Sequence, residues 1–132
     1  MSYCSVSDVR AQCPEVTADD VSDSSVSRFI SEATGVINDT LRHRYAVPFA
    51  PVPPSVNRLC AHLASYYVIR SFPDRHAAED LERLSDDIRW ELESYASGRM
   101  KLDDVYELNV PVGDVYFAKT ARSQKYKYTE VG

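Results

Sequence analysis

Residues 45–72, YAVPFAPVPPSVNRLCAHLASYYVIRSF, contain the stretch that decides the fold. Four prolines in its first half fix φ and remove amide donors, so residues 46–53 are predicted to form an extended strap, neither helix nor central strand. Pro54 suits the first position of a helix, where its missing N–H is not needed. Apolar residues then recur at helical spacing and predict a core helix over about 54–71. Its buried face is expected to comprise Val56, Leu59, Cys60, Leu63, Tyr67 and Val68.

A short helix is predicted at residues 5–13. Ser5 or Ser7 can cap its N-terminus, because a serine oxygen accepts a hydrogen bond from an amide of the first turn. Pro14 ends the helix, since the residue before a proline is driven out of the helical region. The polar stretch 14–25 that follows is predicted to be a loop.

A long helix is predicted next, over about 25–44, with Ser24 or Ser25 as its cap. The basic residues 42–44 are expected in its last turn, where they complement the negative end of the helix dipole. Gly35 costs about 1 kcal/mol relative to alanine unless a neighbouring helix approaches closely there. The apolar stripe of this helix is formed by Val26, Phe29, Ile30, Ala33, Val36, Ile37, Thr40 and Leu41.

A fourth helix is predicted between Pro73 and Gly98, because apolar residues again recur near heptad spacing and glycine commonly ends helices. The predicted inner positions are Ala78, Leu81, Leu84 or Ser85, Ile88, Leu92 and Tyr95. The opposite face is acidic, with Glu79, Asp80, Glu82, Asp86, Asp87, Glu91 and Glu93. Trp90 falls off the apolar stripe, so we expect it to cover an edge of the core or to meet a partner.

Beyond Gly98 the chain changes character. Residues 105–110 and 114–119 are rich in β-branched and aromatic side chains and predict two short strands, a hairpin or an extended arm. The predicted fold is therefore mainly α: a bundle of about four helices, one short and three long, with an extended or β-hairpin C-terminal arm. The helical domain is predicted to comprise residues 1–102, and the arm residues 103–132.

The composition narrows the class of protein. The 132 residues suit one domain, and a net charge of −5 argues against a general nucleic-acid binder. No apolar run approaches the roughly 20 residues that span a bilayer, and the N-terminus does not resemble a signal peptide. We therefore expect synthesis in the cytoplasm. The odd cysteine count (Cys4, Cys13 and Cys60) predicts buried or half-buried thiols, not a disulfide framework.

Charge is spread unevenly along the chain. Residues 74–93 carry a net charge of −5, and residues 118–132 a net charge of +3. This asymmetry predicts a tail that docks on an acidic surface, such as that of a neighbouring copy. Aromatic residues and lysines are interleaved in the tail, which suits addition to the edge of a partner's sheet. Stacking on single-stranded nucleic acid and a disordered end are the alternatives.

Residue sets typical of catalysis or metal binding are missing from the sequence. His43, His62 and His76 lie in three different predicted elements, so they do not form a ligand set. There is no Gly-x-Ser-x-Gly elbow, and four glycines do not supply a phosphate-binding loop. Adjacent acids such as Asp86 and Asp87 diverge on a helix, so we expect them to be solvated. We expect no enzymatic activity, no cofactor and no metal.

A small monomeric helical module that binds DNA or regulates another protein is the main alternative class. A short helix before a long one is the order of elements in a helix-turn-helix domain. However, the 12-residue loop predicted at 14–25 is much longer than the usual turn of three or four residues.

Several motifs, taken together, carry a family resemblance. They are the opening Tyr3-Cys-Ser-Val-Ser-Asp-Val9, the acidic loop, Arg42-His-Arg-Tyr45, Tyr45-Ala-Val-Pro-Phe49, Val52-Pro-Pro54 and Leu59-Cys-Ala-His-Leu-Ala-Ser-Tyr66. In this combination the chain resembles the small head–tail proteins of Mu-like tailed phages, within the phage head–tail connector or adaptor proteins. The similarity covers roughly residues 2–102.

The resemblance implies a structural virion protein located at the capsid vertex. It would assemble as a ring of about a dozen copies under the portal protein, extend the DNA channel, and offer an attachment surface to a tail or stopper protein. DNA would pass through the ring without sequence-specific binding. Each subunit of such a ring needs two different, complementary surfaces.

Two sets of residues are candidates for these surfaces. The acids Glu79, Asp80, Asp86 and Asp87 either meet a neighbour or line the channel, where they would repel phosphates. The predicted subunit or portal interface comprises Tyr45, Pro48, Phe49, Trp90, Tyr116, Phe117, Lys119, Arg122, Lys125, Tyr126, Lys127 and Tyr128.

Overall fold

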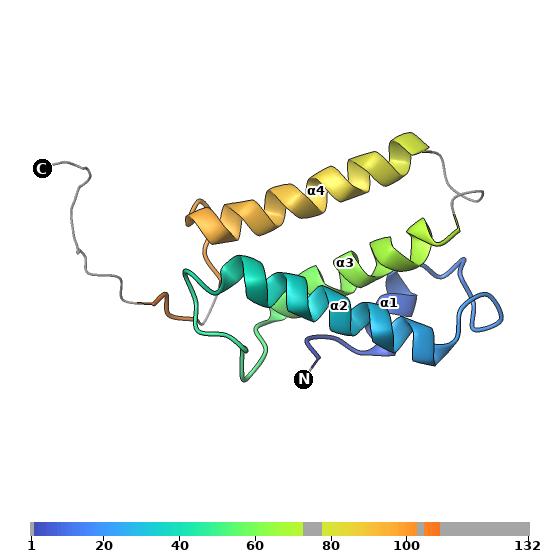
Figure 1. The fold of residues 1–132 in the computed structure, drawn as a ribbon, viewed down its shortest axis with the longest axis horizontal. Helices are drawn as coiled ribbons and strands as arrows, with labels where there is room; N and C mark the ends of the chain where they lie inside the picture. Colours follow the sequence, from blue (N-terminus) through green and yellow to red (C-terminus); the bar gives the residue numbers. More distant parts are fainter. Residues whose placement is uncertain (1, 73–77, 103–104, 109–132) are drawn as a thin grey trace, which may run out of the picture.

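The computed structural model describes residues 2–72, 78–102 and 105–108, and these residues form a mainly α-helical fold. The helices are α1 (Val6–Gln12), α2 (Asp23–Leu41), α3 (Pro54–Arg70) and α4 (Ala78–Ser97). Figure 1 shows α2, α3 and α4 running in alternating directions. Helix α3 packs against all three other helices, which agrees with its predicted place in the core. The predicted bundle of one short and three long helices is confirmed. None of the helices described is long and apolar enough to cross a membrane.

Helix α1 begins with a capping box. The Ser5 hydroxyl accepts a hydrogen bond from the Asp8 amide (3.2 Å), and the Asp8 carboxylate accepts one from the Ser5 amide (2.9 Å). These two bonds satisfy amides that the first turn leaves free. Of the two predicted caps, Ser5 is therefore the one used. Hydrogen bonding to the Ser5 amide and to Asn57 also holds the pKa of Asp8 below its usual value.

Helix α2 begins two residues earlier than predicted. Its cap is Ser22, whose hydroxyl accepts a hydrogen bond from the Ser25 amide at 3.2 Å. The predicted caps at positions 24 and 25 are wrong, because Ser24 and Ser25 already lie inside the first turn. The buried residues of the predicted stripe are Val26, Ile30, Ala33, Ile37 and Leu41. Val36 lies at the edge of that stripe and is 36% exposed.

The C-terminal end of α2 also differs from the prediction. The helix ends at Leu41, whose carbonyl accepts hydrogen bonds from the amides of Arg44 (3.1 Å) and Tyr45 (2.9 Å). No basic residue lies in the last turn, so the predicted position of residues 42–44 is wrong: they follow the end of the helix. The Arg44 side chain turns instead towards α4. No neighbouring helix approaches Gly35 closely, because a β-carbon there would meet no neighbouring atom within 4 Å, so the exception allowed for this glycine does not apply.

The proline strap leads from α2 into α3 as predicted. Residues 46–53 contain no helix, and Pro54 occupies the first turn of α3. The strap is anchored by the buried rings of Tyr45 and Phe49, whose centroids lie 6.1 Å apart. The predicted buried face of α3 is confirmed except at Tyr67, which is half-buried.

Helix α4 ends at Gly98, which adopts a positive φ of 84°. A β-carbon at this position would lie 2.8 Å from the guanidinium carbon of Arg44. Arg44 donates hydrogen bonds to the Ala96 and Ser97 carbonyls, both at 3.0 Å, which the end of the helix leaves without intrahelical donors. Glycine is therefore favoured here by its positive φ, and any larger residue would also have to displace the end of the Arg44 side chain. The predicted inner residues Ile88, Leu92 and Tyr95 are buried.

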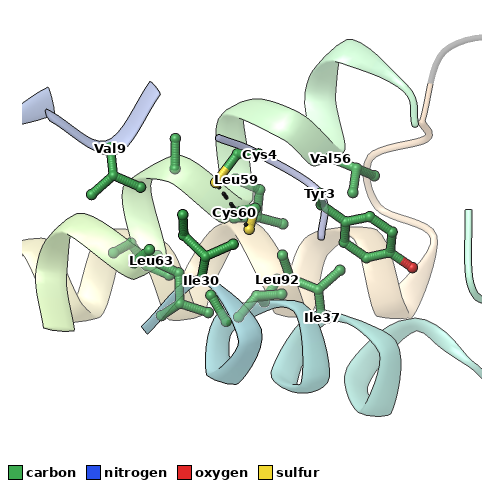
Figure 2. Close-up of a cluster of buried hydrophobic side chains, with 14 of the residues drawn as sticks. Tyr3, Cys4, Val9, Ile30, Ile37, Val56, Leu59, Cys60, Leu63 and Leu92 are labelled. Atoms are coloured by element: carbon green, nitrogen blue, oxygen red, sulfur yellow. Dashed lines mark hydrogen bonds between the residues drawn. The ribbon is translucent and has the colours of Figure 1, made fainter. Parts of the chain in front are cut away.

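Tyr3 connects three parts of the fold, a role that periodicity did not reveal. Its ring is buried beside Phe49, with 5.7 Å between the ring centroids. Its hydroxyl donates to the Asn38 side chain on α2 and accepts from the Phe49 amide at 2.9 Å. Its carbonyl accepts a hydrogen bond from Asn57 on α3 at 3.0 Å. Figure 2 shows Tyr3 at one end of the buried cluster formed by α2, α3 and α4.

The start of the predicted arm contacts the helical domain. Leu102 is buried, and its amide donates to the Tyr45 hydroxyl at 3.2 Å. Glu107 forms an isolated antiparallel bridge with Tyr45, and the Leu108 amide donates to the Arg44 carbonyl at 2.7 Å. Of the first predicted strand, 105–110, the structure describes residues 105–108, and these form a single bridge. The second, 114–119, lies outside them.

Candidate interaction surface

The outward face of α4 carries an exposed tryptophan on an acidic stripe. Ile88, Leu92 and Tyr95 point into the core, so side chains half a turn away from them face outward. Trp90 is on that outward side and is 54% exposed. The exposed acids at helical spacing around it are Glu79, Glu82, Asp86 and Glu93. The predicted position of Trp90 off the apolar stripe is confirmed.

Helix α4 stays strongly negative even when the arginines that pair with its acids are counted. Helix α4 holds seven acids and two arginines, a net charge of −5. Three acids are paired: Asp80 with Arg83 (3.0 Å), Asp86 with Arg89 (3.1 Å), and Glu91 with Arg58 of α3 (2.8 Å). Within the described part of the chain, the remaining acids Glu79, Glu82, Asp87 and Glu93 have no ion pair. Their charges face solvent.

A hollow of about 420 Å³ lies beside Trp90. Its lining combines apolar and charged groups, namely Arg58, Asp87, Trp90, Glu91, Tyr95 and Met100. The hydrogen bond to Glu91 raises the pKa of Arg58, so this guanidinium stays charged and fixed at the wall. The hollow can therefore accept an aromatic or aliphatic group whose polar end meets carboxylates.

The strap has a second hollow, of about 440 Å³, between its prolines and residues 105–106. Pro48 is exposed there, and Tyr106 is 95% exposed. Tyr45 and Phe49 were also predicted interface residues, but their side chains are buried in the chain's own core. Because they hold the strap against Tyr3, the interface hypothesis does not extend to these two rings.

A third hollow, of about 280 Å³, lies between α3 and α4 and was not predicted. On α3 the Arg70 guanidinium lies over the rings of Tyr66 (5.3 Å) and Tyr67 (4.9 Å). Burial raises the pKa of Tyr67. The sequence signal was available, because an arginine three and four residues after two tyrosines shares their side of a helix.

The remaining predicted interface residues lie outside the described part of the chain: Tyr116, Phe117, Lys119, Arg122, Lys125, Tyr126, Lys127 and Tyr128. The same holds for His76. The other two histidines lie apart in the fold, His43 after α2 and His62 on α3. Among the residues described, no three of His, Cys, Asp and Glu gather as metal ligands would.

These features describe a small, mainly α-helical protein whose outer helix is acidic and carries an exposed tryptophan. The family model described as "Bacteriophage Mu, Gp36" matches residues 3–112, and the chain belongs to this phage protein family. The match extends past residue 102, the predicted end of the similarity. The chain is also similar to the Mu-like prophage FluMu protein gp36 of Haemophilus influenzae, with 31% identity over 85 residues. That alignment covers 64% of this chain and 57% of the relative, so the chain spans little more than half of the relative's length.

Proposed function

We propose that this protein is a non-enzymatic virion component, a head–tail connector that forms a ring under the portal. In this role it extends the DNA channel and offers a surface to the tail or to a stopper protein. Membership of the Mu Gp36 family and the resemblance to small head–tail proteins support the proposal. The proposed ring is built from about a dozen copies, each using one surface against a different surface of the next copy.

The observation that carries the proposal is Trp90 on the outer face of α4. A tryptophan that is 54% exposed leaves a large apolar area in contact with water. Aromatic residues are enriched in protein interfaces and often contribute a large share of the binding energy there. Trp90 makes no contribution to the buried core, so an interface is the better reason for its presence.

The charge of the chain suggests what this face binds. Residues 115–129 contain Lys119, Arg122, Lys125 and Lys127 and no acid, and they include two tyrosines near their end. A basic, aromatic segment complements an acidic stripe with a tryptophan at its centre. Lysine or arginine stacked on an indole adds cation–π attraction. We therefore propose that the C-terminal segment of one copy docks on α4 of the next.

The alternative role for the acids, as the wall of a DNA channel, fits this face less well. Acidic groups would repel phosphates and let DNA slide, which favours that role. The exposed indole beside them would instead present apolar surface to passing DNA and water, with no gain in binding. A subunit interface uses both the charge and the indole.

Electron microscopy of the full chain mixed with its portal protein tests the proposal. We expect rings of about a dozen copies on the portal with the wild-type chain. Neutralising the stripe with Glu79→Gln and Glu93→Gln, or truncating Trp90→Ala, is expected to reduce ring formation. Rings that form normally with these variants but retain DNA poorly would assign the face to the channel instead.

The matched control is Asp19→Asn with Glu32→Gln, which removes two exposed acids that belong to the loop before α2 and to α2 itself, not to α4. This control is expected to form rings like the wild type. Absence from purified virions, together with a monomer that shifts duplex DNA in a gel, would overturn the connector role. That result would favour the small DNA-binding module.

A further inference from the structure

Two buried thiols lie next to each other in the core. The sulfur atoms of Cys4 and Cys60 are 3.3 Å apart (Figure 2). Cys4 lies in the short bent segment before α1 and is 8% exposed, and Cys60 lies in the middle of α3 and is fully buried. Both are free thiols. They are 56 positions apart in the sequence, so only the tertiary structure brings them together.

We propose that Cys4 and Cys60 are an oxidation site at which a peroxide forms an intramolecular disulfide. The S–S bond is about 2.05 Å long, so the two sulfurs must approach by little more than about 1 Å. Cys4 belongs to a short segment outside the helices, so we expect it to be the partner that makes this adjustment. The inference rests on the geometry of the core and does not depend on the connector role.

The reaction balances with one peroxide. The thiolate of one cysteine attacks a peroxide oxygen, the O–O bond breaks, and a sulfenic acid and one water form. The second cysteine loses its proton and attacks the sulfenic sulfur, which forms the S–S bond and releases a second water. Two thiols and one hydrogen peroxide therefore give one disulfide and two waters. The sulfur atoms lose two electrons, and the peroxide oxygens gain them.

The hydrogen bonding assigns a role to each sulfur. Cys4 donates to Cys60, and this bond lowers the pKa of Cys60. The same bond, together with burial, raises the pKa of Cys4. Thr34 lies 3.7 Å from the Cys60 sulfur and also stabilises its thiolate. Cys60 is thus the sulfur whose thiolate the surroundings favour, and Cys4, at 8% exposure, is the less deeply buried of the two.

A bond at this position would join the N-terminal segment to the central helix. It closes a loop that contains α1, α2 and the strap, and a cross-link of this length restricts the unfolded chain strongly. It also fixes the backbone next to Tyr3, whose hydroxyl and carbonyl connect the strap and α3. The oxidised protein is therefore expected to melt at a higher temperature than the reduced protein.

Cys13 provides a control within the same chain. It is buried like the other two, but its sulfur bonds to the Val9 carbonyl at 3.3 Å and not to a thiol. Burial raises its pKa, which disfavours the reactive thiolate. Cys13 is expected to survive peroxide treatment as a free thiol.

Peptide mapping by mass spectrometry under non-reducing conditions tests the proposal on the full chain. The folded protein is treated with hydrogen peroxide, quenched, denatured and labelled with a maleimide. We expect a Cys4–Cys60 peptide pair lighter by two hydrogens, one labelled thiol at Cys13, and a melting temperature higher by about 5 °C or more that falls back with dithiothreitol.

Cysteine variants test which thiols form the bond. Cys13→Ser should still form the bond, whereas Cys4→Ala and Cys60→Ala should not. If a variant fails to fold, the peptide map of the wild type still decides. Three labelled thiols after treatment, a bond involving Cys13, or a Cys4–Cys60 bond that forms only after unfolding in denaturant would overturn the proposal.

Discussion

At the scale of single residues, a few buried polar groups determine how the segments meet. The Tyr3 hydroxyl bonds to Asn38 of α2 and to the Phe49 amide of the strap. The Tyr45 hydroxyl accepts from the Leu102 amide. Each tyrosine therefore contributes apolar area and specific polar bonds, two at the Tyr3 hydroxyl and one at the Tyr45 hydroxyl. Together they attach the segments before α1 and after α4 to the region of the strap.

Removing the Tyr3 hydroxyl is expected to be costly. Tyr3→Phe keeps the ring but leaves the Phe49 amide without its partner and removes a donor from Asn38. We expect a loss of about 1–3 kcal/mol in the free energy of unfolding, measured by urea denaturation. Tyr106→Phe, at a side chain that is 95% exposed, serves as the control and should change it by less than about 0.5 kcal/mol. Equal losses in both variants would contradict this role of Tyr3.

At the scale of the elements, specific residues at the helix ends determine where each helix begins or stops. Helix α1 relies on the capping box of Ser5 and Asp8, α3 on proline in its first turn, and α4 on Gly98 with the Arg44 guanidinium over its last carbonyls. Helix interiors are more tolerant, because their contribution comes mainly from an apolar face. Two comparisons test this difference.

The first comparison uses two glycines for which alanine should have opposite effects. Gly35 is exposed inside α2 with no atom near its missing side chain, so Gly35→Ala should stabilise the protein by about 0.5–1 kcal/mol. Gly98 has a positive φ and faces Arg44, so Gly98→Ala should destabilise it by about 1–2 kcal/mol. Urea denaturation measures the change in the free energy of unfolding for each variant. If both changes have the same sign, the roles given to the two glycines are contradicted.

The second comparison concerns pH and the cap of α1. Hydrogen bonding holds the pKa of Asp8 below its unfolded value of about 4. Its contribution to stability is therefore present above pH about 4 and is lost as the pH falls through the lower folded pKa. Asp8→Asn should melt at a lower temperature than the wild type at pH 7, and this gap should narrow in acid.

Thermal melting monitored by circular dichroism, repeated down the pH scale, measures that gap. Asp19→Asn, which removes an exposed carboxylate from the loop before α2, is the control for the change in net charge. A gap between Asp8→Asn and the wild type that stays constant into strong acid would contradict the proposed contribution of the cap.

At the scale of the whole molecule, the residues that form the core differ from those that we propose for docking. Helix α3 contacts every other helix and holds the core, whereas α4 turns a net charge of −5 and Trp90 outward. Residues 119–132, which hold the four cations of the basic segment, contain few large apolar residues. In the ring that we propose, this helix and this segment would be the two complementary surfaces, and the core would not depend on them.

Deleting residues 119–132 tests this separation. The segment contributes little apolar area, so the free energy of unfolding should change by less than about 0.5 kcal/mol. Ring formation on the portal should nevertheless fall, because the deletion removes the four cations proposed to meet α4. Chemical denaturation and electron microscopy of the same preparation report the two effects. A truncated chain that unfolds would mean that this segment belongs to the folded domain.

The sequence by itself determined the elements. Helical periodicity predicted α2, α3 and α4, and it placed Trp90 off the apolar stripe of α4. The prolines predicted the strap and the start of α3. These features follow from interactions between residues close together in the chain, where proline geometry and a period of 3.6 residues act directly. The ends of α2 were less predictable, because several serines and basic residues compete for similar roles there.

Only the tertiary structure decided which distant residues meet. The rings of Tyr45 and Phe49 are buried in the core, and the Arg44 side chain covers the end of α4. The sulfur of Cys4 lies 3.3 Å from that of Cys60. Each of these contacts depends on the positions of packed helices relative to one another, which local patterns do not encode. The physical reason is that such a contact is selected by the packing of the whole core and by the need to satisfy buried polar groups, and not by neighbours along the chain.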